Sequence, residues 1–135
     1  MLKYIESTDG ISCRHLDQGF FENWKNPVSP EMHLEILRGS SHVVLAVDEA
    51  TDKVVGFVTA VSDGVLSAYI PLLEVLPTYR GRRIGSELVR RMLERLKHLN
   101  MVDLTCDEHL TRFYERFGMQ RSSAMVIRRY LVDQN

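Results

Sequence analysis

A long amphipathic run in the second half of the chain constrains the fold more than any other feature. Its apolar residues recur at steps of four and three, which places them on one face of a helix. They are Ile84, Leu88, Met92, Leu96 and Leu99, with Val89 and Leu93 beside them. An apolar, strand-like run that ends at Leu76 precedes this helix, with a glycine-containing turn between the two. Such a unit is typical of α/β proteins, so we expect the helix to cover a sheet.

Weaker patterns supply the remaining strands and helices. Strands are expected at residues 2–6, 42–47, 54–61, 68–76, 101–106 and 124–132, and further helices at 17–24, 30–38 and 110–117. The runs 42–47 and 54–61 form a hairpin, and Pro71 should interrupt 68–76 because proline cannot donate a ladder hydrogen bond. The order predicts an α/β (α+β) fold, a single domain over residues 1–135. Its mixed, mostly antiparallel sheet should be flanked by about four helices.

Composition and charge narrow the class of function. The 135 residues are 44% hydrophobic and 26% charged, which suits one globular domain. A formal net charge of −1 gives no general attraction to nucleic acid or to an anionic membrane. We expect no membrane span and no signal peptide, because no apolar run is long enough and residues 1–10 lack the pattern. With two cysteines only, Cys13 and Cys106, we expect a cytoplasmic protein without disulfides.

The turn before the long helix has the features of an anion site. The start of a helix leaves about four backbone N–H groups unpaired and carries roughly half a positive charge. Gly81 and Gly85 have no side chains to keep an anion from those amides. Arg80, Arg82 and Arg83 crowd the same end, where each cation is unfavourable by about 0.3–1 kcal/mol. The turn is therefore predicted to bind phosphate groups, the alternative being a solvated basic turn with glycine caps.

Two other polar clusters point to no ligand. Residues 106–109, Cys-Asp-Glu-His, are adjacent and cannot all converge on one ion, so we predict no metal site. The basic residues between 90 and 98 alternate with Glu87 and Glu94. That alternation favours a solvated helix face over a nucleic-acid surface.

The segment Val75–Ser86 resembles the acyl-CoA-binding motif of the GNAT acyltransferase family, approximately R/Q-x-x-G-x-G/A after a strand that ends in Val-x-Pro. Arg80, Gly85 and Ser86 fit or nearly fit, whereas Arg83 stands where the family usually has its first glycine. Residues 113–119, Phe-Tyr-Glu-Arg-Phe-Gly-Met, resemble the family's F-Y-x-x-x-G-F element. The order of strands and helices also agrees with the family from about residue 40 to the end. The chain is thus similar to acetyl-CoA-dependent N-acetyltransferases.

The resemblance implies a cofactor and a place for it. Acetyl-CoA (coenzyme A) would lie between two splayed parallel strands, with its pantetheine arm along the edge Leu73–Leu76. The backbone N–H of Val75 or Leu76 would polarise the thioester carbonyl. The residues expected to bind the cofactor are Val75, Leu76, Arg80, Gly81, Arg82, Arg83, Ile84, Gly85, Ser86 and Tyr114.

Two side chains are candidates for proton transfer in such a reaction. Tyr114 could donate a hydrogen bond to the departing sulfur, unless it is simply a core aromatic residue. Glu74 is the best candidate base for the acceptor amine, unless its strand only directs it to solvent. Tyr69 and Asp107 are weaker options.

The acceptor site should come largely from the first forty residues and the hairpins. Phe20, Phe21 and Trp24 could form an aromatic wall or could merely anchor a short helix. Glu22, Glu31 or Asp63 could attract a cationic amine. We expect an enzyme that N-acetylates a small-molecule or peptide amine, the alternative being a non-catalytic acyl-CoA-binding sensor or interaction module. The last strand could pair across a homodimer, although nothing in its sequence demands it.

Overall fold

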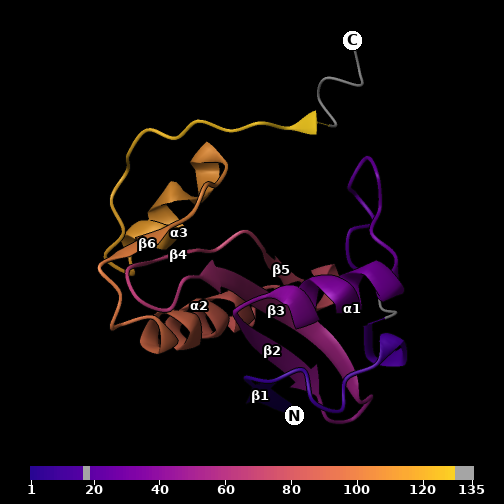
Figure 1. Ribbon diagram of the computed structural model, residues 1–135. Helices are drawn as coiled ribbons and strands as arrows, with labels where there is room; N and C mark the ends of the chain where they lie inside the picture. Colours follow the sequence, from indigo (N-terminus) through magenta and orange to yellow (C-terminus); the bar gives the residue numbers. More distant parts are fainter. Residues whose placement is uncertain (17–18, 130–135) are drawn as a thin grey trace. The chain divides into compact units, whose positions relative to one another are not determined.

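The computed structural model describes residues 1–16 and 19–129 (Figure 1). Contacts divide the chain into two units, Met1–Leu104 and Thr105–Asn135, each treated by itself below. The first unit contains six strands in the hydrogen-bonded order β1–β2–β3–β4–β6, with β5 also paired to β3. Every pair is antiparallel except β4 with β6. The sheet is therefore mixed and mostly antiparallel, as predicted.

The antiparallel part begins with β1 (Leu2–Ile5), β2 (His42–Asp48) and β3 (Lys53–Ser62). The last two are the predicted hairpin, with one register irregularity between Ala46 and Val47. Both are buried on both faces, which explains why their sequences are continuous apolar runs rather than alternating ones. The fully buried residues include Val44, Leu45, Ala46, Val54, Val55, Phe57 and Val58.

The predicted strand 68–76 is interrupted at Pro71, as expected. It forms two short strands, β4 (Ser67–Tyr69) and β5 (Leu73–Val75). On one side β4 pairs with β3, and on the other it runs parallel to β6 (Met101–Asp103). Within the described ranges β5 pairs with β3 alone. The second edge of β5 therefore has no paired strand in the described part of the chain, because β6 pairs with β4 instead.

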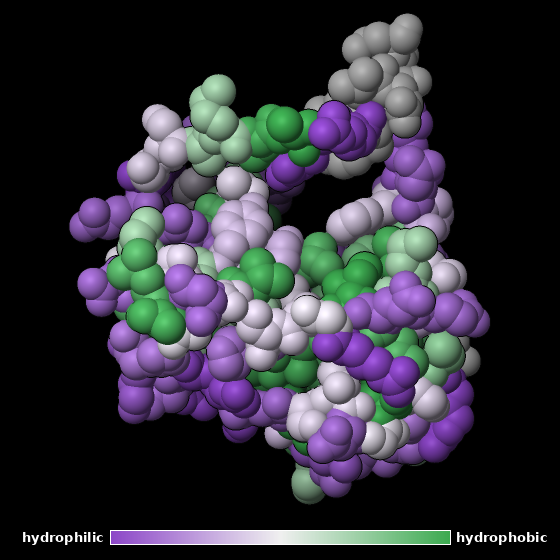
Figure 2. Space-filling view, viewed as in Figure 1, coloured by the Kyte–Doolittle hydropathy of each residue, from purple (hydrophilic) through white to green (hydrophobic). Residues whose placement is uncertain are grey.

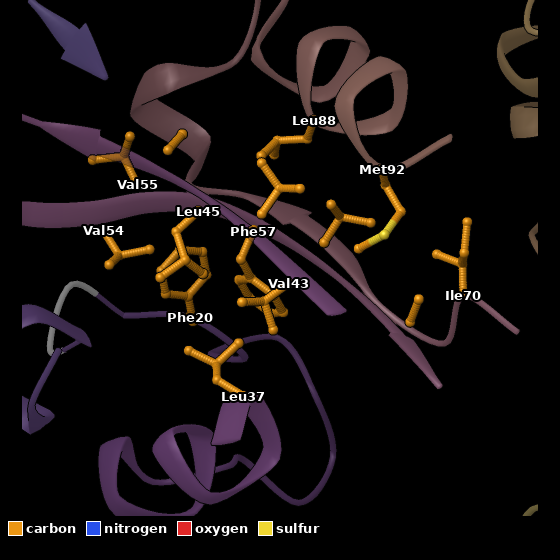
Figure 3. Close-up of a cluster of buried hydrophobic side chains, with 14 of the residues drawn as sticks. Phe20, Leu37, Val43, Leu45, Val54, Val55, Phe57, Ile70, Leu88 and Met92 are labelled. Carbon is orange, nitrogen blue, oxygen red and sulfur yellow. The ribbon is translucent and has the colours of Figure 1, made fainter. Parts of the chain in front are cut away.

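Helix α2 (Ile84–Arg95) packs closely on one face of this sheet. A Cβ atom at Gly56 would lie 3.2 Å from both Ile84 Cγ2 and Leu88 Cδ1, so any larger residue there would push these side chains away by a few tenths of an ångström. The predicted apolar face is buried, and Leu88 and Met92 point from the helix into the core in Figure 3. This contact places the start of α2 beside the end of β5.

Helix α1 (Pro30–Gly39) covers the opposite face. Ser29 is its N-cap, since the Ser29 hydroxyl accepts a hydrogen bond from the Met32 N–H at 3.1 Å, as the Ser29–Pro30 pair predicts. Leu37 points from the helix toward Phe20 and Val43 in Figure 3. The two helices therefore enclose the sheet from both sides.

An aromatic cluster fills the space under α1. Phe20, Phe21 and Phe57 surround His33, with ring centroids 4.5–5.2 Å from the imidazole. His33 is 1% exposed, and neither ring nitrogen has a hydrogen-bond partner in the part of the chain that the structure describes. Burial lowers the pKa of His33 to about 4, because an apolar environment disfavours the charged imidazolium.

The predicted helix 17–24 is wrong over its described part. Residues 17–18 lie outside the described residues, and residues 19–24 form turns. Gly19 has φ 93° and Phe21 has φ 70°, values that an α-helix excludes. The helical spacing of the aromatic residues instead reflects a tight turn that buries Phe20 and Phe21.

The second unit is small. A 3₁₀ helix (Glu108–Leu110) leads into α3 (Thr111–Glu115), where Phe113 packs against Tyr114 and Phe117. The positive φ of Gly118, 88°, ends this segment as expected of a glycine cap. The other 3₁₀ helices are Cys13–Leu16 and Pro77–Tyr79 in the first unit.

The predicted last strand, 124–132, is not formed over residues 124–129, and the rest of it lies outside the described residues. A strand needs a hydrogen-bonded neighbour, and this run has none there. Its apolar side chains lie at the surface, with Met125 98% exposed. No helix within residues 1–16 and 19–129 has the length and hydrophobicity needed to cross a bilayer.

Candidate active site

The connection from β5 to α2 is built by two residues with positive φ. After the 3₁₀ helix Pro77–Tyr79, Gly81 has φ 83° and Arg83 has φ 61° and ψ 22°. The left-handed conformation of Arg83 is unusual for a residue with a Cβ atom. The motif that Val75–Ser86 resembles usually has glycine at this position, and glycine adopts the left-handed conformation without strain. Helix α2 begins at the next residue.

This connection, the arginine turn (Arg80–Ser86), presents a row of unpaired amides. The first N–H of α2 with a backbone acceptor is that of Glu87, which donates to Arg83 O at 3.1 Å. No hydrogen-bond acceptor within residues 1–16 and 19–129 is found for the N–H groups from Gly81 to Ser86. A Cβ atom at Gly81 would have no atom within 4 Å, so the space in front of the turn is open. Such a row attracts an anion.

The three arginines of the turn differ from the other basic residues of α2. Further along the helix, Arg90 and Arg91 both bond Glu87, and Arg95 pairs with Glu6 at 2.9 Å. The Arg90 and Arg91 guanidiniums hold the pKa of Glu87 at about 2. In contrast, no carboxylate from the described residues forms an ion pair with Arg80, Arg82 or Arg83. The arginines at the start of α2 therefore have no ion-pair partner among the described residues, whereas those further along the helix are paired with carboxylates.

A hydrogen bond that sequence reasoning missed anchors the turn to the sheet. The Tyr79 hydroxyl donates to Asp48 Oδ2 at 2.6 Å, joining the 3₁₀ helix to the end of β2. The Arg82 guanidinium lies 5.0 Å from the Tyr79 ring centroid. The hydrogen bond from Tyr79 lowers the pKa of Asp48 and raises the pKa of Tyr79. The tyrosine two residues after Pro77 was the only sequence signal for this anchor.

The register of β5 separates the two predicted backbone donors. The Leu76 N–H donates to Val55 O at 2.9 Å, so this amide is already paired with β3. Backbone groups alternate in direction along a strand, which turns the N–H and C=O of Val75 toward the open edge. Accordingly Val75 O accepts from Arg80 Nε at 3.3 Å. Val75 is thus the amide of the two that faces the open edge.

Glu74 points to the other side of the sheet from Val75. It is paired with Phe57, which lies in the aromatic cluster, whereas Val75 is paired with Gly56 beneath α2. Glu74 is partly buried. Burial raises the pKa of its carboxyl, and the nearby Arg80 charge opposes part of that rise. A carboxylate with a raised pKa is a better proton acceptor than an ordinary one.

Tyr114 lies on α3 in the second unit and is 9% exposed. Its ring meets Phe113 edge-on at a centroid distance of 4.9 Å. Of the weaker proton-transfer candidates, Tyr69 is partly buried on β4 and Asp107 is exposed. The structure therefore brings together Glu74, Val75 and the arginine turn, and the role of Tyr114 stays a prediction.

The predicted acceptor residues divide into two groups. Phe21 and Trp24 line an apolar groove of about 450 Å³, whereas Phe20 is buried in the core. The apolar groove is formed chiefly by Phe21, Trp24, Val28, Val61, Pro71 and Leu72, and Glu35 lies among its lining.

The predicted carboxylates do not line this groove. Glu22 and Glu31 are exposed elsewhere, and Asp63 accepts the N–H groups of Val65, Leu66 and Ser67 in its own loop. Glu35 was missed because Glu31 lies one helical turn away on the same side of α1, and the sequence cannot tell which of them borders the groove.

The residues present fit coenzyme A. Its pyrophosphate needs several hydrogen-bond donors and positive charge, which the amides and the three arginines of the turn supply. Its pantetheine arm carries amides that can add to a strand edge, and β5 has an open one. No cluster of three or more metal-binding side chains occurs among the residues described.

Comparison with known proteins identifies the family of the chain. The chain is similar to a candidate acetyltransferase from Deinococcus radiodurans, with 46% identity, a TM-score of 0.90, and coverage of 96% of this chain and 89% of that one. A GNAT-family acetyltransferase from Streptococcus pneumoniae is 27% identical, with a TM-score of 0.74 and coverage of 96% and 99%. Glucosamine-6-phosphate N-acetyltransferase from Arabidopsis thaliana shares the fold, at 20% identity, a TM-score of 0.69, and coverage of 95% and 97%.

No curated protein matches the chain at a significant level. The model of the acetyltransferase (GNAT) family matches residues 11–119, a span that includes the open edge of β5, the arginine turn and Tyr114. The chain belongs to the GNAT acetyltransferase family.

Proposed function

We propose that this chain transfers the acetyl group of acetyl-CoA to a primary amine by direct attack in a ternary complex. The observation that carries the proposal is the row of unpaired N–H groups from Gly81 to Ser86, with three arginines that have no carboxylate partner among the described residues. This row begins a few residues after β5, whose edge is open. A binding site for phosphates next to a free strand edge is what a pantetheine pyrophosphate requires.

Each residue has a proposed task. When bound, acetyl-CoA supplies an acetyl group activated as a thioester. The Val75 N–H donates to the thioester carbonyl oxygen, where negative charge develops. Glu74 takes a proton from the incoming amine, directly or through water, and Tyr114 gives a proton to the departing sulfur. The C–N bond would form as the C–S bond breaks. The ammonium group would lose two protons in all, one reaching the departing thiolate through Tyr114 and the other released to solvent through Glu74.

The proposal is tested in two steps. Coenzyme A at about a hundred times its Kd should stabilise the fold by roughly 2.7 kcal/mol, which is visible as a rise in melting temperature. Thiol release from acetyl-CoA, measured against a panel of amines, then tests catalysis. No thermal shift at millimolar coenzyme A would refute cofactor binding. A thermal shift without thiol release for any amine would favour the non-catalytic acyl-CoA-binding module.

A further inference from the structure

The apolar groove lies on the same face of the sheet as Glu74. Phe57 and Glu74 are directly paired across β3 and β5, and directly paired residues share a face. Val61, four residues along β3 from Phe57, is on that face too and lines the groove. Pro71 and Leu72, just before β5, also line it. The groove therefore lies beside the strand that carries the candidate base.

Two apolar side chains in the walls of the groove are exposed. Trp24 is 43% exposed and Val61 is 45% exposed. Figure 2 shows hydrophobic side chains, in green, reaching the surface on the face viewed there. Covering apolar surface is favourable by about 25 cal/mol per Å². The groove volume of about 450 Å³ lies in the range of small-molecule sites.

The orientation of Trp24 is held by a strained turn. Phe21 has φ 70°, which is a rare backbone conformation for a bulky residue. Its ring is held at centroid distances of 5.0 Å from His33 and 6.0 Å from Phe57. The Trp24 N–H donates to Phe21 O at 3.0 Å, and the two rings meet edge-on at 4.8 Å. Strain of this kind persists where the surrounding packing fixes it, often at ligand sites.

The charge of the groove is negative. Glu35 is the one charged residue in its described lining, and it forms no ion pair with any residue in the described ranges. The other polar side chain, Ser40, already donates its hydroxyl to Ile36 O at 2.8 Å. Such a groove attracts a protonated amine, and it offers no cation to an amine that also carries a carboxylate or a phosphate.

We propose that the groove binds the apolar body of the acceptor, and that the acceptors are small primary amines with an aromatic or branched aliphatic group and no negative charge. This inference rests on the proposed acetyl transfer. The apolar body lies against Trp24 and Val61, and the amine lies at the β5 end, where Glu74 takes its proton. Glu35 draws the cation in and disfavours anionic acceptors.

The single tryptophan of the chain reports on the groove without any need for turnover, since that residue is Trp24. The protein is titrated with 2-phenylethylamine, with and without coenzyme A, while Trp24 fluorescence is followed. We expect a saturable change for 2-phenylethylamine and none for ethanolamine, which lacks the apolar group. Phenylalanine, which adds only a carboxylate to the same body, should bind at least about tenfold more weakly. Equal responses to all three amines, or none at 10 mM, would overturn the proposal.

Matched variants localise the effect. Glu35→Gln should raise the Kd for 2-phenylethylamine about two- to fivefold, whereas Glu31→Gln, one turn away and outside the groove, should not. Trp24→Ala should raise the KM for 2-phenylethylamine about tenfold or more and leave the KM for acetyl-CoA unchanged. Met32→Ala removes an exposed apolar side chain of α1 outside the groove and serves as its control.

The outcomes separate this inference from the proposed function. Binding of 2-phenylethylamine to the groove without thiol release for any amine would refute acetyl transfer and leave the binding site. Thiol release with ethanolamine or an amino-sugar phosphate, but not with 2-phenylethylamine, would overturn the inference and keep the proposed function. A Trp24 response only to a peptide with an apolar N-terminal residue would assign the groove to protein acceptors, against the small-amine proposal.

Discussion

Arg83 offers the sharpest test of the arginine turn, because substitution should move stability and affinity in opposite directions. Its φ of 61° is costly for any residue with a Cβ atom, by about 1 kcal/mol. Its charge lies at the positive end of α2, which costs about a further 0.3–1 kcal/mol. Arg83→Gly removes both costs. We predict that the unliganded variant is about 1–2 kcal/mol more stable than the wild type.

The same substitution should weaken coenzyme A binding. A guanidinium hydrogen bond to a phosphate is worth about 1.5–3 kcal/mol, which corresponds to a loss of roughly tenfold to 150-fold in affinity. Urea denaturation of the unliganded protein measures the first effect, and isothermal titration with coenzyme A measures the second. Arg83→Ala removes the charge but keeps the Cβ atom, so its stability should lie between those of the wild type and Arg83→Gly.

Arg83→Lys is the matched control. It keeps both the charge and the Cβ atom, so it should change unliganded stability little and affinity less than the glycine variant. An Arg83→Gly variant that is less stable than the wild type would refute the left-handed conformation. A Kd for coenzyme A within twofold of the wild type would refute a phosphate contact by Arg83.

The remaining predictions concern four side chains. Glu74→Gln should lower turnover about a hundredfold or more. It should also abolish the rise in rate that the wild type shows as pH passes through the raised pKa of Glu74, because only the carboxylate accepts a proton. An unchanged pH–rate profile would remove Glu74 as base. Tyr114→Phe should lower kcat more than it weakens coenzyme A binding, and an unchanged kcat would remove its assigned role. Tyr79→Phe should weaken coenzyme A binding and lower the melting temperature at neutral pH. Because the folded pKa of Asp48 is depressed, the Tyr79–Asp48 pair stabilises the fold above the unfolded pKa of about 3.9, and this stability is lost as pH falls through the folded pKa. The melting temperatures of the wild type and Tyr79→Phe should therefore converge in acid. A difference in melting temperature that stays constant with pH would contradict the hydrogen bond. The pKa of His33 is about 6.5 in the unfolded chain and about 4 in the folded one. As pH falls from 6.5 to 4, the free energy of unfolding of the wild type should therefore fall by up to about 3 kcal/mol, a loss that His33→Phe does not share. Parallel urea-denaturation profiles of the two proteins would refute a buried neutral His33.

Sequence patterns predicted the parts of the fold in which one residue type has one structural meaning. The four- and three-residue spacing of α2 could only be a helix face, and Pro71 could only interrupt a strand. The turn before α2 was also predicted from such a local pattern, and the structure shows a turn there, while the binding of an anion to it stays a prediction. These are local signals, and the structure shows the expected elements at each of them.

Features that depend on pairing and register were not accessible. Whether Val75 or Leu76 presents a free N–H depends on which residues of β3 lie opposite, and the sequence does not state this. The run 17–24 has helical spacing of aromatic residues, yet Gly19 and Phe21 adopt positive φ because the buried cluster under α1 decides their conformation. In each case a contact between distant segments overrides the local preference.

The central claim is that coenzyme A binds through the amides of the arginine turn and the open edge of β5. Titration of ¹⁵N-labelled protein with coenzyme A, followed residue by residue by NMR, tests it most directly. We predict that the amide signals from Gly81 to Ser86 and that of Val75 shift strongly and become protected from hydrogen exchange. The Leu76 amide, already bonded to Val55 O, should be protected before and after binding. Saturable binding of coenzyme A that leaves the Gly81–Ser86 amides unshifted would contradict the account.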